Sequence, residues 1–536
     1  MSKKVLLTSV FGPYAQDDKY GSRSINPMEL FHNQVTRVQG IFSLRMFHRS
    51  WGLNFIKENI DAPCVILDFP KLKRFVREIK KNSYDIIGIS SIYVNLRKVK
   101  IMCRLVRKFS PKSTIVVGGH IANTPGIEKI IDADRIVKGE GIKWFREFLG
   151  EDTSKPIKHP AMFAEISPKI MGIPLFQRSK SNFAVLIPAV GCPMGCNFCS
   201  TSHMFGGKGK FVDFFPKAKS LYETIDSIAS RLKTNRFFVM DENFLLNKTK
   251  TLKLLDMMKK NNKNWIFYIF SSANALKQYD IQTLLELGIS FIWIGLEGED
   301  SGYEKLASTD TYELVDNLRA NGIHVLGSTI IGMDHQDSRD VKKTINNAVK
   351  YNTDFHQFML YMPLPGTPLY NDFMGKDLLF NAKNFDLADA HGQYKFNYKH
   401  PLIESGKENN LLLEAFKMDF IKNGPSVIRF FETLLNGWEK YSNSENKRIQ
   451  AIIKDRADIF IHILPGLIKS VQTYYRKNLK TEWPLGNIQK RAWSHASPLD
   501  KLIAPLIGAW IKIMMVLETR RILKGLAPEP PTFYER

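Results

Sequence analysis

Short apolar runs alternate along most of this chain with stretches in which apolar residues recur at helical spacing. This alternation comes in two separate series. In the first 150 residues the runs have no polar face, so each strand must be covered on both sides. Parallel sheets with helices on both faces meet that need. Residues 1–150 are therefore predicted to form an α/β domain with a doubly wound parallel sheet. Its strand-like runs lie at 4–10, 64–68, 84–90, 114–117 and 135–137, and its helical stretches at 71–81, 95–109 and 126–131.

The second series begins after a proline-rich linker at 151–182. Six βα units in succession predict a partial (βα)6 barrel at 183–399, with its chemistry at the carboxyl ends of the strands. From 400 to 536 the pattern turns helical, which predicts a C-terminal helical region. A chain of 536 residues is too long for one core, in agreement with several units. The barrel runs lie at 183–187, 236–240, 265–270, 291–296, 324–331 and 356–361.

The chain is strongly basic, with 76 Lys and Arg against 53 Asp and Glu and a net charge of +23. This excess fits an anionic partner or simply a solvated basic surface. No nucleic-acid module accompanies the charge, so nucleic acid is not an expected partner. Five cysteines exclude a disulfide scaffold and fit a reducing compartment. The N-terminal apolar run is too short for a signal peptide, so we expect a cytoplasmic protein.

The strongest motif is at 191–199, Gly-Cys-Pro-Met-Gly-Cys-Asn-Phe-Cys, directly after the first barrel strand. Three thiolates on one tight loop can bind three irons of a 4Fe-4S cluster and leave the fourth iron open. A zinc site needs a fourth ligand, for which His203 is the local candidate. The other two cysteines, Cys64 and Cys103, lie in apolar runs and are predicted to be inert core thiols.

A C-x3-C-x2-C loop at the head of a six-unit barrel resembles the radical S-adenosylmethionine (radical SAM) superfamily, over about residues 183–370. The resemblance implies that Cys192, Cys196 and Cys199 bind the cluster and that Phe198 flanks the adenine of SAM. It also implies reductive cleavage of SAM to a 5′-deoxyadenosyl radical. The electron would come from a donor of the flavodoxin or ferredoxin type.

Polar residues after the next barrel strands match further positions of that family. The resemblance implies an ammonium contact after the second strand, a carboxylate or ribose contact after the third, a ribose or ammonium contact after the fourth, and adenine packing after the fifth. Helix capping, ordinary loop polarity and a surface ion pair are the alternatives. The residues are Asp241, Glu242 and Asn243; Ser271, Ser272 and Asn274; Glu297; and Gly332.

The segment 364–370, Leu-Pro-Gly-Thr-Pro-Leu-Tyr, resembles one that is common in cobalamin-dependent radical SAM enzymes, and residues 1–150 resemble their cobalamin-binding domain. Glycine-rich strand ends serve any doubly wound sheet, so this resemblance is less specific. The D-x-H-x-x-G motif is absent, so no histidine from that motif would bind cobalt. His120 has an alternative as an ordinary loop residue. The residues implied for cobalamin are Ser90, Gly118, Gly119, His120, Gly139, Glu140 and Gly141.

Two such cofactors imply a methyltransferase that acts on an unactivated carbon, with no catalytic side chain assigned. One alternative is a radical SAM enzyme for ring formation or carbon–carbon coupling. Another is a non-catalytic cluster protein or nucleic-acid module that uses the basic surface.

The substrate is expected to be a small molecule or a lipid. The segment 502–517 is very apolar, is interrupted by Pro505 and Lys512, and is followed by further cations at 520–524. That pattern fits a helix in the interface of an anionic membrane, or else a buried core helix or an oligomer contact. Residues 201–205 resemble the segment that follows the cysteines in hopanoid methylases, which favours a lipid substrate and a peripheral membrane contact.

Overall fold

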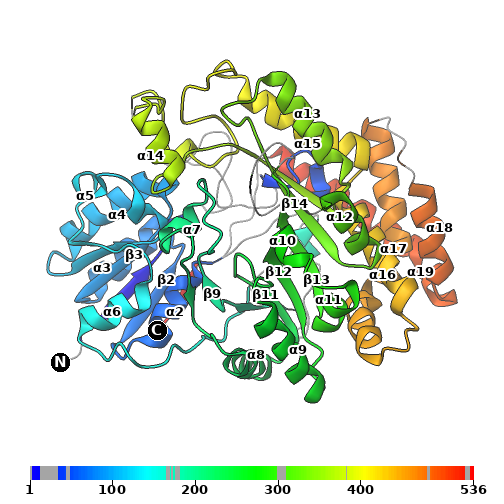
Figure 1. The fold of residues 1–536 in the computed structure, drawn as a ribbon, viewed down its shortest axis with the longest axis horizontal. Helices are drawn as coiled ribbons and strands as arrows, with labels where there is room; N and C mark the ends of the chain where they lie inside the picture. Colours follow the sequence, from blue (N-terminus) through cyan, green and yellow to red (C-terminus); the bar gives the residue numbers. More distant parts are fainter. Residues whose placement is uncertain are drawn as a thin grey trace.

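The chain is seen in a computed structural model that describes residues 3–12, 34–43, 49–164, 182–297, 303, 310–381, 383–479, 483, 485–524 and 532–536, and the backbone of two short strands at 169–170 and 173–174. Figure 1 shows a blue and cyan sheet domain at one end, a green barrel in the centre and orange to red helices at the other end. The predicted fold class is confirmed. The predicted linker at 151–182 lies partly outside the described residues.

The N-terminal sheet has the order β16-β2-β1-β3-β4-β5, and β1 to β5 are parallel. Helices α3, α4 and α5 pack on one face of it, and α2 and α6 pack on the other. The doubly wound arrangement follows from strands that are apolar on both sides. The elements are β1 (Val5–Thr8), α2 (Trp51–Asn59), β2 (Cys64–Asp68), α3 (Leu72–Lys81), β3 (Ile86–Ser90), α4 (Leu96–Phe109), β4 (Thr114–Gly118), α5 (Ile127–Ile130), β5 (Arg135–Ile136) and α6 (Gly141–Leu149), with short 3-10 helices η1 (Gly40–Phe42), η2 (Tyr93–Asn95) and η3 (His120–Asn123).

The C-terminal end of the chain returns to this N-terminal sheet. Strand β16 (Phe533–Glu535) pairs antiparallel with β2, with Tyr534 opposite Leu67. The helical prediction for 400–536 is wrong at these residues. Three residues carry no periodicity of their own, and only the exposed edge of β2 gives them a partner.

The barrel prediction is confirmed. Its six parallel strands follow in sequence order, β8-β11-β12-β13-β14-β15, and β8 and β15 form the two edges, so the barrel is open. Aliphatic and aromatic side chains of the strands pack against the outer helices. The elements are β8 (Ala184–Leu186), α8 (Ala218–Leu232), β11 (Arg236–Val239), α9 (Lys248–Lys260), β12 (Ile266–Ser271), α10 (Ala273–Leu276), α11 (Ile281–Leu287), β13 (Ile289–Gly295), α12 (Thr311–Ala320), β14 (His324–Ile331), α13 (Ser338–Lys350), β15 (Phe355–Leu360) and α14 (Pro368–Gly375).

The C-terminal helices form a separate layer with their own apolar core, built from residues such as Phe431, Leu435 and Ile468. This layer covers the side of the barrel that carries β14 and β15 (Figure 1). The helices are α15 (Glu408–Asn423), α16 (Ser426–Tyr441), α17 (Lys447–Leu479), α18 (Leu485–His495) and α19 (Pro498–Leu523).

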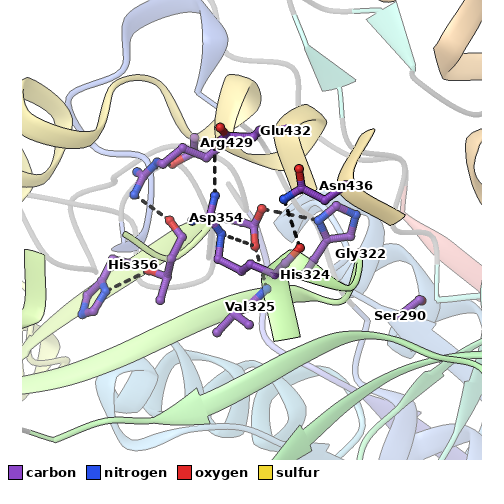
Figure 2. Close-up of polar contacts among 12 residues, drawn as sticks. Ser290, Gly322, His324, Val325, Asp354, His356, Arg429, Glu432 and Asn436 are labelled. Carbon is purple, nitrogen blue, oxygen red and sulfur yellow. Dashed lines mark hydrogen bonds and ion pairs between the residues drawn. The ribbon is translucent and has the colours of Figure 1, made fainter. Parts of the chain in front are cut away.

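A buried polar network ties these helices to the amino ends of β14 and β15 (Figure 2). Arg429 donates to both carboxylate oxygens of Asp419, at 3.0 and 2.6 Å, and to the carbonyl of Thr353 at 2.6 Å. Asp354 accepts from the Val325 amide at 2.8 Å. These groups lie at the ends of the strands opposite to the barrel mouth, which indicates a structural role.

Electrostatics agree with that role. Burial alone raises the pKa of the Asp354 carboxyl, but Arg319 and His324 outweigh it and hold that pKa below its usual value. Burial lowers the pKa of His324. The carboxylate is therefore ionised inside the protein, where its neighbours compensate the lost hydration.

We expect the Arg429→Met variant to be destabilised by about 3–5 kcal/mol, because it leaves the Asp419 carboxylate buried without its cation. Arg107→Met is the matched control, because Arg107 pairs with Asp132 and Asp134 at the surface and such pairs contribute about 0–1 kcal/mol. The midpoints of thermal unfolding of the full chain measure both effects. Equal shifts for the two variants would contradict the structural importance of the buried pair.

Candidate active site at the barrel mouth

The three cysteines lie on the loop between two short paired strands, β9 (Ala189–Val190) and β10 (Val212–Asp213), at the head of the barrel. Glycine makes this loop possible. Gly195 has φ +65°, and a Cβ there would lie 2.5 Å from Cα of Lys208. A side chain would separate the two arms of the loop. Helix α7 (Ser200–Met204) begins directly after the last cysteine.

The loop is held by its own backbone. The Cys199 amide donates to the Cys196 carbonyl at 3.0 Å, and the Ser202 hydroxyl donates to the Cys192 carbonyl at 2.6 Å. All three thiols are partly exposed. The pKa of the Cys192 thiol is raised to about 11, first by burial and then by the neighbouring sulfurs of Cys199 and Cys196. The charges of the other two thiolates thus act on the Cys192 thiol.

The zinc alternative gains no support from the geometry. His203 Nε2 lies 3.2 Å from the carbonyl oxygen of Cys196 and so has a backbone partner. Among the described residues, no group of three or more His, Cys, Asp and Glu side chains is arranged to hold a metal ion. Three thiolates that each bind a different iron need no such convergence on one point. Cys64 and Cys103 are buried, and burial raises the pKa of each to about 12, in agreement with unreactive core thiols.

Two partly buried carboxyl groups follow β11 beside the cysteine loop. Burial raises the pKa of Asp241 to about 6 and that of Glu242 to about 7. The backbone of Gly191, next to Cys192, partly offsets the rise in the pKa of Glu242. Within the described residues, Oε2 of Glu242 is buried and has no hydrogen-bond partner. A buried carboxylate oxygen of this kind is a candidate acceptor for a cation bound at the loop.

Asn243 connects the loops after β11 and β12. Its Nδ2 donates to Ser272 Oγ at 3.0 Å, and its Oδ1 accepts from the Ser272 amide at 3.0 Å and from Ser271 Oγ at 3.3 Å. Ser272 also caps α10. The three side chains thus use their polar atoms on one another, which favours a role in positioning Asp241 and Glu242. Asn274 follows on the same helix and is partly exposed.

The carboxyl ends of the other barrel strands bring in further predicted residues. Glu297 is buried after β13 and has an unusual positive φ of +41°, and residues held in such conformations cluster at functional sites. Gly332 after β14 has φ +71°, and a Cβ there would lie 2.7 Å from the ring of Phe396. The space next to its Cα is therefore already occupied by the Phe396 side chain.

A cavity of about 190 Å³ lies between the N-terminal sheet and the barrel. Its floor is the carboxyl ends of β3 and β4, and α2 and α6 form its sides. Its opposite wall comes from the barrel domain and includes Met204 and Phe205, which follow the cysteine loop. Six of the seven residues predicted for cobalamin line it, namely Ser90, Gly118, Gly119, Gly139, Glu140 and Gly141.

Two of those predicted residues behave differently from the rest. His120 does not line the cavity. Burial lowers its pKa to about 4, and its Nδ1 is buried with no hydrogen-bond partner among the described residues. The Glu140 carboxylate accepts from the Ile142 and Lys143 amides and so caps α6. Gly119 has φ +83°, and a Cβ there would lie 2.5 Å from the Ser91 carbonyl oxygen, so that position requires glycine.

Residues 186–348, from β8 to α13, match the family model of the radical SAM superfamily. This segment is a radical SAM domain. The resemblance to the radical SAM superfamily is thereby confirmed, and with it the prediction that the chain is an enzyme.

Two relatives of the radical SAM domain and its neighbouring regions are methyltransferases. An uncharacterized methyltransferase of Pyrococcus horikoshii is 22% identical over 333 residues, which cover 56% of this chain and 72% of that protein. Bacteriochlorophyllide d C-12(1)-methyltransferase of Chlorobaculum tepidum is 24% identical over 331 residues, which cover 57% of this chain and 69% of that protein.

A solved structure is similar over most of the chain. The radical SAM methyltransferase TsrM of Kitasatospora setae, with cobalamin and a 4Fe-4S cluster bound, superposes with a TM-score of 0.52 at 15% identity. The match covers 86% of this chain and 100% of TsrM. At this identity the likeness concerns the fold, and it extends beyond the radical SAM domain.

No sequence motif marks Tyr303 and Tyr361, which lie at the cysteine loop of the radical SAM domain. Tyr303 Oη donates to Asn197 Oδ1 at 3.0 Å, and its ring lies 5.0 Å from that of Phe198 in an edge-on contact. Burial, followed by the neighbouring Tyr361, raises the pKa of Tyr303. Isolated tyrosines far apart in sequence carry no motif, so only the folded chain brings them to the loop.

Proposed function

We propose that this protein is a cobalamin-dependent radical SAM methyltransferase that acts on an unactivated carbon of an apolar substrate. One observation carries the proposal. Met204 and Phe205, directly after the cysteine loop, form one wall of the cavity whose floor is the N-terminal sheet. A group bound at the loop and a group bound in the cavity would therefore be neighbours. The cofactors of TsrM and the names of the two relatives support the same assignment.

The residues present fit the cluster and SAM. Cys192, Cys196 and Cys199 would hold three irons, and the buried Oε2 of Glu242 would accept from the ammonium of SAM. Asn243 would fix the loop that carries Glu242 through its bonds to Ser271 and Ser272. Phe198, Asn274, Glu297 and Gly332 remain predictions for the rest of SAM.

The cavity fits part of cobalamin. Its lining is mostly apolar, and glycines at positions 88, 118 and 119 keep side chains out of its floor. No histidine is among the described residues that line it. When bound, the cluster supplies an electron for the cleavage of SAM, and cobalamin supplies a transferable methyl group. His120 remains a prediction without a place in the cavity.

The chain's own residues then have three tasks. The three thiolates would bind the cluster, and Glu242 would bind and orient SAM. The loops after β11 and β12, which Asn243 connects, would keep Glu242 in that orientation. The apolar cavity walls would exclude water from a cofactor bound there. Abstraction of a hydrogen atom needs no side-chain base, so we assign no catalytic residue.

Aromatic side chains on the barrel strands support an apolar substrate. Phe270 stacks on Trp293, with ring centroids 5.1 Å apart, and packs against Phe238 at 6.0 Å. All three side chains are partly exposed. We infer a lipid or another apolar molecule as the substrate, a flavodoxin- or ferredoxin-type donor of electrons, and action in the cytoplasm or at its membrane surface.

Transfer of an isotopically labelled methyl group from SAM tests the reaction. Reconstituted protein, reductant, cobalamin and a lipid extract should yield a labelled apolar product together with 5′-deoxyadenosine. If 5′-deoxyadenosine forms but no extract yields a labelled product, ring formation or carbon–carbon coupling would be favoured instead. A protein that binds iron but never cleaves SAM would contradict both reactions.

We expect SAM affinity to rise as the pH rises from about 6 to about 8, because Glu242 has a pKa raised to about 7 by burial and only its ionised form attracts the ammonium. Glu242→Gln should lower the affinity at pH 8 at least tenfold, or about 1.4 kcal/mol, and should flatten the pH profile. Equilibrium dialysis with labelled SAM measures both. An unchanged profile in the variant would show that another group sets it.

A further inference from the structure

Helix α19 presents an apolar stripe to its surroundings. Large side chains recur along it, mostly at spacings of three and four residues, and their exposed fractions lie between 48% and 81%. A helix that is apolar on all sides is normally buried, and an exposed patch of this kind marks an interaction site. The exposed stripe consists of Leu499, Leu502, Leu506, Trp510, Ile513, Val516, Leu517 and Leu523.

The opposite face of α19 is packed on α17 and the rest of the helical layer. Ala504, Ile511 and Met515 are buried. Small residues allow a close crossing, since Ser470 Oγ donates to the Gly508 carbonyl at 3.3 Å and a Cβ at Gly466 would lie 2.9 Å from the Ala504 carbonyl oxygen. The stripe is therefore fixed on a folded support.

Among the described residues, 498–521 form the one helix long and apolar enough to cross a membrane, with a mean hydropathy of 1.7 and 17% of that window buried. One side of α19 is already packed against the protein, so only its other side is free to contact lipid. That arrangement is typical of a helix that lies in the plane of a membrane interface.

The charges around the stripe are positive. The acidic residues of α19 have internal partners, because Asp500 pairs with His462 at 2.8 Å and Glu518 pairs with Arg521 at 3.3 Å. Four further cations are exposed and form no ion pair with any described residue: Lys501, Lys512, Arg520 and Lys524.

We propose that the exposed stripe of α19 docks the protein on an anionic lipid surface. The apolar side chains enter the interface, and the four cations meet the headgroups. A second copy of the chain is the poorer occupant, because a symmetric contact through α19 would bring its unpaired cations together. The proposal does not depend on the reaction that the enzyme performs.

Flotation of the full-length protein with vesicles tests the proposal. With vesicles of phosphatidylcholine and phosphatidylglycerol the bound fraction should exceed that with phosphatidylcholine alone at least fivefold. It should fall, but not vanish, as salt rises from about 0.05 M to about 0.5 M, because salt screens the charges and leaves the apolar contact intact. Equal binding to both vesicle types, or no binding to either at low salt, would overturn the proposal.

Two variants and a matched control separate the two contributions. Leu502→Ser combined with Ile513→Ser should lower binding at every salt concentration at least tenfold. Lys501→Gln combined with Lys512→Gln and Arg520→Gln should lower binding mainly at low salt. Ile421→Ser removes a similarly exposed apolar side chain outside the stripe and should bind like the wild type, with circular dichroism as the check on folding.

Sedimentation of the same proteins distinguishes the competing occupant. The expected result is one mass in solution for the wild type and for the stripe variant. A wild-type dimer that the stripe variant abolishes, together with the absence of vesicle binding, would show that a second copy covers the stripe and would overturn the lipid assignment.

Discussion

Cys196→Ala should abolish the formation of 5′-deoxyadenosine and lower the iron content of the anaerobically reconstituted protein to a small fraction of the wild-type value. Each of the three thiolates binds its own iron, so two of them cannot retain a stable cluster. The fold should survive, because Cys196 is partly exposed on a loop at the barrel mouth and lies outside the apolar cores. Iron analysis and chromatography of the reaction mixture measure the effect.

Cys103→Ala is the control for that experiment. Cys103 is a buried thiol of the N-terminal core, and its loss removes packing without touching the loop. Its 5′-deoxyadenosine yield per bound iron should match that of the wild type, with at most a lower unfolding temperature. Continued SAM cleavage in the Cys196→Ala protein would contradict the cluster assignment.

Local residue patterns account for the part of the fold that can be predicted from the sequence. Strands such as β2 and β14 were predicted with the bounds that the structure shows, because both are apolar runs that end at loop residues. The cysteine loop was equally clear, since three thiols within eight residues of a chain with five cysteines carry a specific chemical pattern. Local patterns of this kind need no knowledge of the rest of the fold.

What the sequence could not supply depends on contacts between distant segments. Strand β16 exists because β2 offers a free edge, and Tyr303 acquires its place only where it contacts Asn197. Asn243 looked like a ligand of SAM by position, but its bonds to Ser271 and Ser272 favour a bracing role. The same residue types serve both purposes, and spacing alone does not separate them.

Cobalamin binding should depend on the absence of side chains from the floor of the cavity. The Gly118→Leu variant tests this, and we expect a large loss of cobalamin affinity. Gly118 ends β4 and lines the cavity of about 190 Å³. A Cβ at this position would meet Val137 at 3.8 Å, an ordinary contact, so the backbone tolerates a side chain. The remaining carbons of leucine then occupy space that the cofactor needs. We expect cobalamin affinity to fall at least tenfold, measured from the absorbance that stays with the protein after gel filtration.

The control is Gly118→Ala, whose single methyl group fits the available space and should leave cobalamin binding close to that of the wild type. A point substitution is the better test than removal of the N-terminal domain. Trp51 and Phe55 of α2 share an apolar core with Val185 and Ile187 of the barrel, so truncation would expose that core. Gly118→Leu should also keep its iron, because the cysteine loop is untouched. Full cobalamin binding by the leucine variant would place the cofactor elsewhere, whereas loss of cobalamin together with loss of iron would show that the substitution disturbs the fold.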